Sequence, residues 1–154
     1  MDDVKSTLAE IGKKNGIEIV FDDAGACALP LEDDRFLQIQ IREGLDEVDF
    51  VATLGGVPNE VRGAVFQALL AANYYWKETL GATLSWHQDL DQVILAYPIP
   101  YRTTDAATLE TVFGNFLKLQ AEWSLRLRGD IAEAQALMKA EASETDPSTA
   151  RIFG

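Results

Sequence analysis

The sequence predicts an α+β fold: an antiparallel β-sheet of about five to six strands with three helices, in the order α-β-β-β-β-α-β-β-α. Three observations support this fold class. Segments with the period of a strand are grouped together rather than alternating with helices. The links between neighbouring strand segments are too short to hold a crossover helix, so neighbouring strands should pair antiparallel. Finally, a chain of 154 residues suits one domain with its own hydrophobic core.

The N-terminal part predicts a short amphipathic helix followed by four strands. Val4, Leu8 and Ile11 recur at helical spacing, and Asn15-Gly16 supplies a stop signal. Pro30 has no amide hydrogen, which places the second strand at a sheet edge or ends it there. Apolar residues stand at every second position of the four strands, namely Ile17, Ile19 and Phe21; Cys27, Leu29 and Leu31; Leu37, Ile39 and Ile41; and Val48, Phe50, Ala52 and Leu54.

Residues 61–76 predict a helix that is apolar on every side. Alanines fill the positions between its large apolar side chains, so little polar surface is left around the helix. One side can face the sheet, and the other needs a second cover, for which a subunit interface is the natural candidate. Tyr74-Tyr75-Trp76 cannot all point inward, because adjacent residues lie about 100° apart on a helix. At least one of them should lie at a surface.

Two more strands and a third helix complete the predicted domain. Apolar residues alternate over 82–86 and 93–97, with a hairpin turn between the two segments. Apolar residues then follow helical spacing from Leu109 to Leu127, and Gly129 is predicted to end that helix.

The predicted domain organisation has one boundary. Residues 1–128 form the α+β domain, and residues 129–154 form a C-terminal extension. Within the extension we expect a short helix over 130–140 and a flexible segment over 143–149.

Composition and charge narrow the class of protein. With 25 acidic and 13 basic side chains, the formal net charge is −12, which disfavours nucleic acid and anionic membranes as partners. Cys27 is the only cysteine, so no internal disulfide can form and a reducing cytosol is the simplest location. No apolar run approaches the roughly 20 residues of a membrane span, and no cleavable signal is visible. We therefore expect an intracellular protein that inserts into no membrane.

No motif for catalysis is present in the sequence. His87 is the only histidine, whereas zinc normally takes three or four protein ligands. Acidic residues surround Cys27 in the sequence, and they disfavour a reactive thiolate. Asp89 and Asp91 lack the later ligands of a calcium loop, and Gly55-Gly56 lacks the Lys-Ser/Thr of a phosphate loop. The sequence therefore predicts a binding protein without catalytic residues, metal or cofactor.

Several short motifs follow one another along residues 1–128. They are Asp23-x-Gly25-x-Cys27-x-Leu29, Asp33 before Ile39-x-Ile41, Leu69-Leu70-x-x-Asn73, Leu80-Gly81-Ala82-Thr83-Leu84, Val93-x-Leu95 before Pro98, and Asp105-x-x-x-Leu109-x-x-x-Phe113-x-x-Phe116 leading to Trp123. With these motifs, the order of elements, the length and the acidity, the chain resembles the small chaperones of bacterial type III secretion. This family is the Tir chaperone (CesT-like) family, also called class I effector chaperones.

The resemblance implies a homodimer in the bacterial cytoplasm that binds the N-terminal chaperone-binding region of secreted effector proteins. The effector segment would wrap around the dimer in an extended form, without ATP. In the family the second helix and the neighbouring strand form the dimer interface, which here implies Val61, Val65, Phe66, Leu69, Leu70, Tyr74, Trp76 and Leu84. Effector grooves of the family lie on the first helix and the sheet, which implies Val4, Leu8, Ile11, Ile17, Ile19, Val93 and Leu95.

Two other functions are open on the sequence alone. The same fold occurs in YbjN-like proteins, so the chain could be a regulatory or other protein-binding module that is not dedicated to secretion. A small enzyme with an unrecognised site is the third reading, for which a deep polar pocket with perturbed carboxylates would be the signature.

Overall fold

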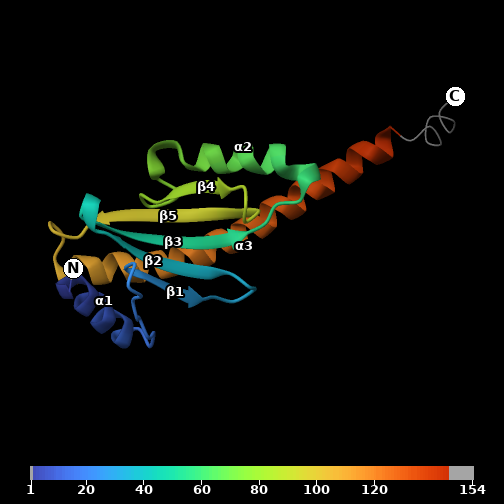
Figure 1. Ribbon diagram of the computed structural model, residues 1–154. Helices are drawn as coiled ribbons and strands as arrows, with labels where there is room; N and C mark the ends of the chain where they lie inside the picture. Colours follow the sequence, from blue (N-terminus) through green and yellow to red (C-terminus); the bar gives the residue numbers. More distant parts are fainter. Residues whose placement is uncertain (1, 146–154) are drawn as a thin grey trace, which may run out of the picture.

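A computed structural model describes residues 2–145 and confirms the α+β class, with three α-helices and five strands in this part of the chain (Figure 1). Short 3-10 turns lie at 43–45, 59–61 and 74–76. The elements in chain order are α1 (Asp2–Lys14), β1 (Ala26–Pro30), β2 (Phe36–Arg42), β3 (Glu47–Gly55), α2 (Arg62–Ala72), β4 (Thr83–His87), β5 (Gln92–Pro100) and α3 (Ala106–Glu144).

The five strands form one antiparallel sheet in the order β1-β2-β3-β5-β4. Short links pair β1 with β2 and β2 with β3, and a hairpin pairs β4 with β5. β3 pairs with β5, the later strand of that hairpin, so the segment that holds α2 connects β3 to the edge strand β4. β1 is an edge strand whose last residue is Pro30, as its missing amide hydrogen predicts. β4 forms the opposite edge, so two strands of the sheet have a side without a neighbouring strand.

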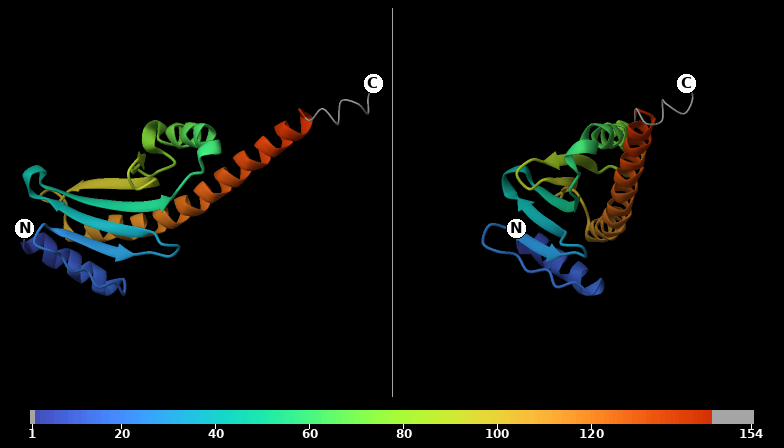
Figure 2. Two further views of the ribbon diagram at one scale, coloured as in Figure 1. Left: turned by 45° about the vertical axis from the view of Figure 1, so that its right-hand side comes forward. Right: turned by 90° about the vertical axis from the view of Figure 1, so that its right-hand side faces the viewer.

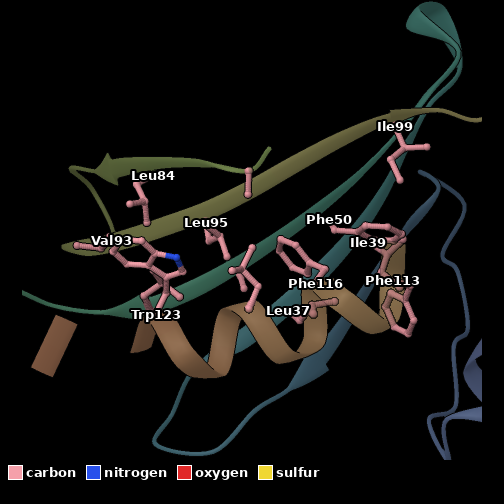
Figure 3. Packing of buried hydrophobic residues seen from close by; sticks show 14 of the residues in the cluster. Leu37, Ile39, Phe50, Leu84, Val93, Leu95, Ile99, Phe113, Phe116 and Trp123 are labelled. Atoms are coloured by element: carbon pink, nitrogen blue, oxygen red, sulfur yellow. The ribbon is translucent and has the colours of Figure 1, made fainter. Parts of the chain in front are cut away.

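The core lies between one face of the sheet and α3, which crosses that face (Figure 2). The Phe50 ring on β3 lies 5.3 Å from that of Phe113 and 5.8 Å from that of Phe116, centroid to centroid (Figure 3). Further along α3, Trp123 lies on the side of the helix that faces the sheet, where it is buried beside Val93 and Leu95 (Figure 3). α1 lies near β1 and α2 near β4, so the two shorter helices flank the sheet at opposite edges.

The strand predicted over Ile17–Phe21 is not formed, and this prediction was wrong. The Ile17 amide donates to the carbonyl of Gly12 at the end of α1, so the chain folds back along that helix. Ile19 is buried in the core all the same. Alternation therefore indicated correctly that one side of the segment is apolar, but here α1 and the core cover that side and no strand pairs with it.

The second helix is shorter than predicted, because α2 ends at Ala72 and a separate 3-10 turn follows at Tyr74–Trp76. Its end is set by a tertiary contact: the Asn73 side chain bonds to the backbone of Leu84 on β4. The prediction that at least one of Tyr74, Tyr75 and Trp76 lies at a surface is confirmed, since all three are exposed.

The third helix is longer than predicted, because α3 runs through Gly129 to Glu144. The prediction of a helix end at Gly129 was wrong. Glycine inside a helix costs only about 1 kcal/mol, and the half-buried Ile131 and Ala134 continue the apolar side of α3 beyond it. The boundary at residue 128 stays a prediction. Of the segment predicted to be flexible, residues 146–149 lie outside the described residues.

Candidate protein-binding surfaces

The eight residues predicted for a dimer interface divide into two groups. Val61, Val65, Leu69 and Leu84 are buried within the single chain and hold α2 against the sheet and α3. Leu70, Tyr74 and Trp76 are exposed by 71%, 74% and 53%, and Phe66 is half-buried between the two groups. Leu70, Tyr74 and Trp76 are therefore the members of this set that are open to a second molecule.

A small apolar hollow lies where α2 meets the edge strand β4. It has a volume of about 130 Å³, and its lining is Phe66, Leu69, Leu70, Leu84, Ser85 and Trp86. The Phe66 and Trp86 rings pack with centroids 5.0 Å apart, and the Arg62 guanidinium lies 4.7 Å from the Trp86 ring centroid. We call this hollow, together with Tyr74 and Trp76, the α2–β4 surface. Trp86 was not predicted to belong to it, although it stands two residues from Leu84 on the same short strand.

The segment after α2, residues 74–80, combines exposed apolar side chains with a strained backbone. Tyr75, Trp76 and Leu80 have φ angles of 54°, 52° and 50°, in the left-handed region that bulky residues avoid. The Tyr74 and Tyr75 rings meet edge to face, 4.6 Å apart. Leu80 is 66% exposed and was not predicted as a surface residue, because a single leucine between Thr79 and Gly81 belongs to no helical or strand period.

The seven residues predicted for effector binding are mostly core residues. Val4, Leu8 and Ile11 of α1, Ile19, and Val93 and Leu95 of β5 are buried in the single chain. The regular spacing of these residues in the sequence therefore reflects their burial in the protein's own core. Ile17 is the exception, because it is half-buried and lines a groove at the surface.

The groove that Ile17 lines runs beside β1. It has a volume of about 280 Å³ and is lined by Gly16, Ile17, Glu18, Leu29, Pro30, Leu31, Leu37 and Leu117. We call it the β1 groove. Its residues come from the segment that follows α1, from β1 and the residue after it, from β2, and from α3. The walls are mainly aliphatic, with Glu18 as the one charged residue.

The outer edge of β1 beside this groove is partly free. Leu31 donates to Arg35 and Ile41 donates to Gly25, which puts the alternate residues Ala26 and Ala28 on the outward side of the ladder. The Ala26 amide and carbonyl bond to Asp22, so that position is capped from within the chain. Ala28 is left with its backbone N–H and C=O directed away from β2.

Two polar contacts lie at the ends of α1 and α3. Lys14 at the end of α1 bonds to Glu110 of α3 at 2.8 Å, and this hydrogen bond raises the pKa of Lys14. Asp105 caps α3 by accepting from the Thr108 amide at 2.7 Å, which lowers the pKa of Asp105. The Lys14–Glu110 pair therefore links the end of α1 to α3, and the Asp105 cap begins α3.

The described residues hold no cluster with the composition of a metal site. Among residues 2–145, no three His, Cys, Asp or Glu side chains come together in a way that could hold an ion. His87 accepts a hydrogen bond from the Leu90 amide at its own hairpin turn, and Cys27 is buried in β1. In the same part of the chain, no helix is long and apolar enough to cross a membrane.

Comparison with known proteins adds a family and a fold. The model of the Tir chaperone protein (CesT) family matches residues 6–124. No sequence among the curated proteins matches the chain significantly.

Solved structures of similar fold include a chain of the ExsC–ExsE complex, with a TM-score of 0.69 and 17% identity over 82% of this chain and 94% of that one. A chain of the HopA1–SchA chaperone–effector complex has a TM-score of 0.59 and 16% identity, over 79% and 92%. A chain of the heterodimeric ExoU–SpcU complex from the type III secretion system of Pseudomonas aeruginosa has a TM-score of 0.59 and 20% identity, over 83% and 97%.

Proposed function

The chain belongs to the Tir chaperone protein (CesT) family, and from that premise we propose that it is a type III secretion chaperone. It binds the N-terminal chaperone-binding region of an effector protein in extended form, without ATP, in the bacterial cytoplasm. The bound segment stays soluble and competent for secretion. The similar folds found in a chaperone–effector complex and in a complex from a type III secretion system support this proposal.

The observation that carries the proposal is an apolar groove beside an open strand edge. An extended peptide can pair its backbone with Ala28 on β1 and place alternate side chains toward Ile17, Leu29 and Leu31. Backbone pairing gives affinity that depends little on sequence, while the aliphatic walls select for apolar residues at every second position. This combination suits a client that must stay unfolded.

Net charge supports the same client chemistry. The chain carries a formal charge of −12, which helps to keep it soluble and attracts basic segments of a client. An extended client gives up conformational entropy on binding, and the apolar area that it buries must offset this cost. Basic residues between the apolar positions of the client would face the acidic surface.

We further propose that the chaperone is a homodimer whose interface is the α2–β4 surface. Leu70, Tyr74 and Trp76 expose large apolar side chains there. β4 is an edge strand of the sheet, and its Leu84 backbone is bonded to the Asn73 side chain of the same chain. A stable interface commonly buries about 800 Å² on each partner, which needs more than one hollow. The exposed aromatic segment at 74–76 adds further apolar surface beside the hollow.

Co-expression with the effector encoded beside this gene tests the proposal. We expect the two proteins to purify together, with two chaperone chains for each effector, and the effector to lose solubility when it is expressed alone. A chaperone that stays monomeric at micromolar concentration would contradict the homodimer. Recovery of a partner that is never secreted would instead favour a regulatory module of the same fold.

A further inference from the structure

The C-terminal half of α3 carries a second apolar groove, and much of it lies beyond the residues that the family model matches. That model ends at residue 124, whereas α3 continues to Glu144 past the first turns of α2 (Figures 1 and 2). The groove lies between these two helices and has a volume of about 360 Å³. Its floor includes Ala64 and Ala68 of α2 and Leu137 and Met138 of α3.

The floor becomes exposed because α3 outruns α2. Leu127 on the inner side of α3 is buried, Ala134 is half-buried, and Met138, which follows on the same side, is 43% exposed. Leu137 beside it is 61% exposed. The same apolar side of the helix is thus progressively uncovered. Ala64 and Ala68 are exposed as well, and their small side chains allow another helix to approach α2 closely.

The rim of the groove is acidic. Asp130, Glu133 and Glu141 line it, and within residues 2–145 none of these three carboxylates forms an ion pair. The cations that precede them on α3 are already engaged, since Arg126 pairs with Glu78 and Arg128 with Asp33. The groove therefore combines an apolar floor with uncompensated negative charge.

We propose that this groove binds a basic amphipathic helix of a partner protein, with its apolar side on the floor and its Lys or Arg side chains at the rim. A helix fits better than an extended segment, because α2 and α3 offer no free backbone edge with which a strand could pair. The rim from Asp130 to Glu141 spans about three turns, roughly 17 Å, which matches a short recognition helix.

Charge argues against a second copy of this chain as the occupant. Between residues 129 and 145 the chain has four acidic residues and a single basic one, Lys139. A twofold contact between two such helices would set carboxylates against carboxylates. The proposal is also separate from the client site above, because the β1 groove and α2 lie at opposite edges of the sheet.

The test uses the full chain and two designed peptides of about 15 residues. One is a leucine–lysine peptide with leucines at helical spacing, and the other has glutamate in place of each lysine. Fluorescence anisotropy at near-physiological salt measures binding. We expect the leucine–lysine peptide to bind and the leucine–glutamate peptide not to bind.

Two variants locate the binding site. Leu137→Asp should weaken binding of the leucine–lysine peptide by at least about tenfold, because a carboxylate would stand in the apolar floor. Leu125→Asp is the matched control, since Leu125 is 64% exposed on the same helix but does not line the groove. Both variants add one negative charge, so a purely electrostatic attraction would strengthen with each. Both positions are exposed, and circular dichroism confirms that the fold is kept.

Three outcomes would overturn the proposal. The first is equal binding of both peptides, or an equal effect of the two variants. The second is a rise in affinity of about tenfold or more when residues 146–154 are deleted, which would make the chain's own C-terminal segment the occupant. The third is an oligomer that Leu137→Asp dissociates, which would make the occupant a second copy.

Discussion

Asn73 and Leu84 exchange two hydrogen bonds, both 2.9 Å long. The Asn73 side-chain amide donates from Nδ2 to the Leu84 carbonyl, and its Oδ1 accepts from the Leu84 amide. One side chain at the end of α2 thus satisfies both backbone groups of a residue on the edge strand β4. This pair joins the helix and the strand that make up the α2–β4 surface, so that surface is presented as one unit.

Replacing Asn73 by alanine leaves both backbone groups of Leu84 without this partner. We expect Asn73→Ala to lower the free energy of unfolding by about 1–3 kcal/mol, because buried polar groups that lose their partners carry the full cost of desolvation. Urea unfolding measures the change. Gln67→Ala on the exposed side of α2 is the control and should change stability by less than about 0.5 kcal/mol. Equal stability of the two variants would show that water replaces the Asn73 bonds.

The proposed dimer interface is tested by a variant that spares the core. Leu70→Asp should shift the protein from dimer to monomer in sedimentation velocity, because it buries a carboxylate in an apolar interface. Leu70 is 71% exposed in the single chain, so the monomer should keep its fold. Leu69→Asp is unsuitable, since Leu69 is buried and its loss would unfold the chain. Leu45→Asp, at an exposed leucine away from this surface, should leave the dimer intact.

The client site is tested at the backbone rather than at a side chain. Ala28→Pro removes the outward amide of β1 but keeps the bonds that Cys27 and Leu29 make with β2. We expect co-purification of the effector to fall by about tenfold, the equivalent of one good hydrogen bond. Ala28→Val is the control, because it enlarges the side chain and keeps the amide. If both variants retain the effector equally, the client does not pair with β1.

The apolar periods in the sequence predicted most helices and strands correctly, because these elements place one side in the core. The prediction was wrong where the type of element depends on which other segment packs against it. Phe50 and Phe113 were placed on a strand and a helix by their periods, and they meet in the core. Ile17–Phe21 had the same kind of period, but it packs along α1 rather than pairing as a strand. An apolar period indicates that one side of a segment is buried, but it does not indicate which element packs against that side.

The candidate site was predicted less well than the fold for a related reason. Apolar residues at regular spacing are mostly core, so six of the seven residues assigned to effector binding are buried. The exposed apolar residues Leu80, Leu137 and Met138 have no such signal in the sequence. Their exposure depends on the left-handed backbone at Leu80 and on the length by which α3 exceeds α2. Both are tertiary properties.

The continuity of α3 through Gly129 gives a direct test of the C-terminal half of that helix. An added Cβ at Gly129 would meet nothing within 4 Å, and the position is helical. Gly129→Ala should therefore stabilise the protein by up to about 1 kcal/mol, because alanine favours the helix and restricts the unfolded chain. Thermal unfolding followed by circular dichroism measures the effect. Gly16→Ala is the matched control: its surroundings are equally open, but its φ of +70° makes alanine unfavourable, so this variant should unfold at a lower temperature. If Gly129→Ala also lowered the unfolding temperature, the result would indicate that the helix ends at Gly129. The groove beside Leu137 would then lose one of its two walls.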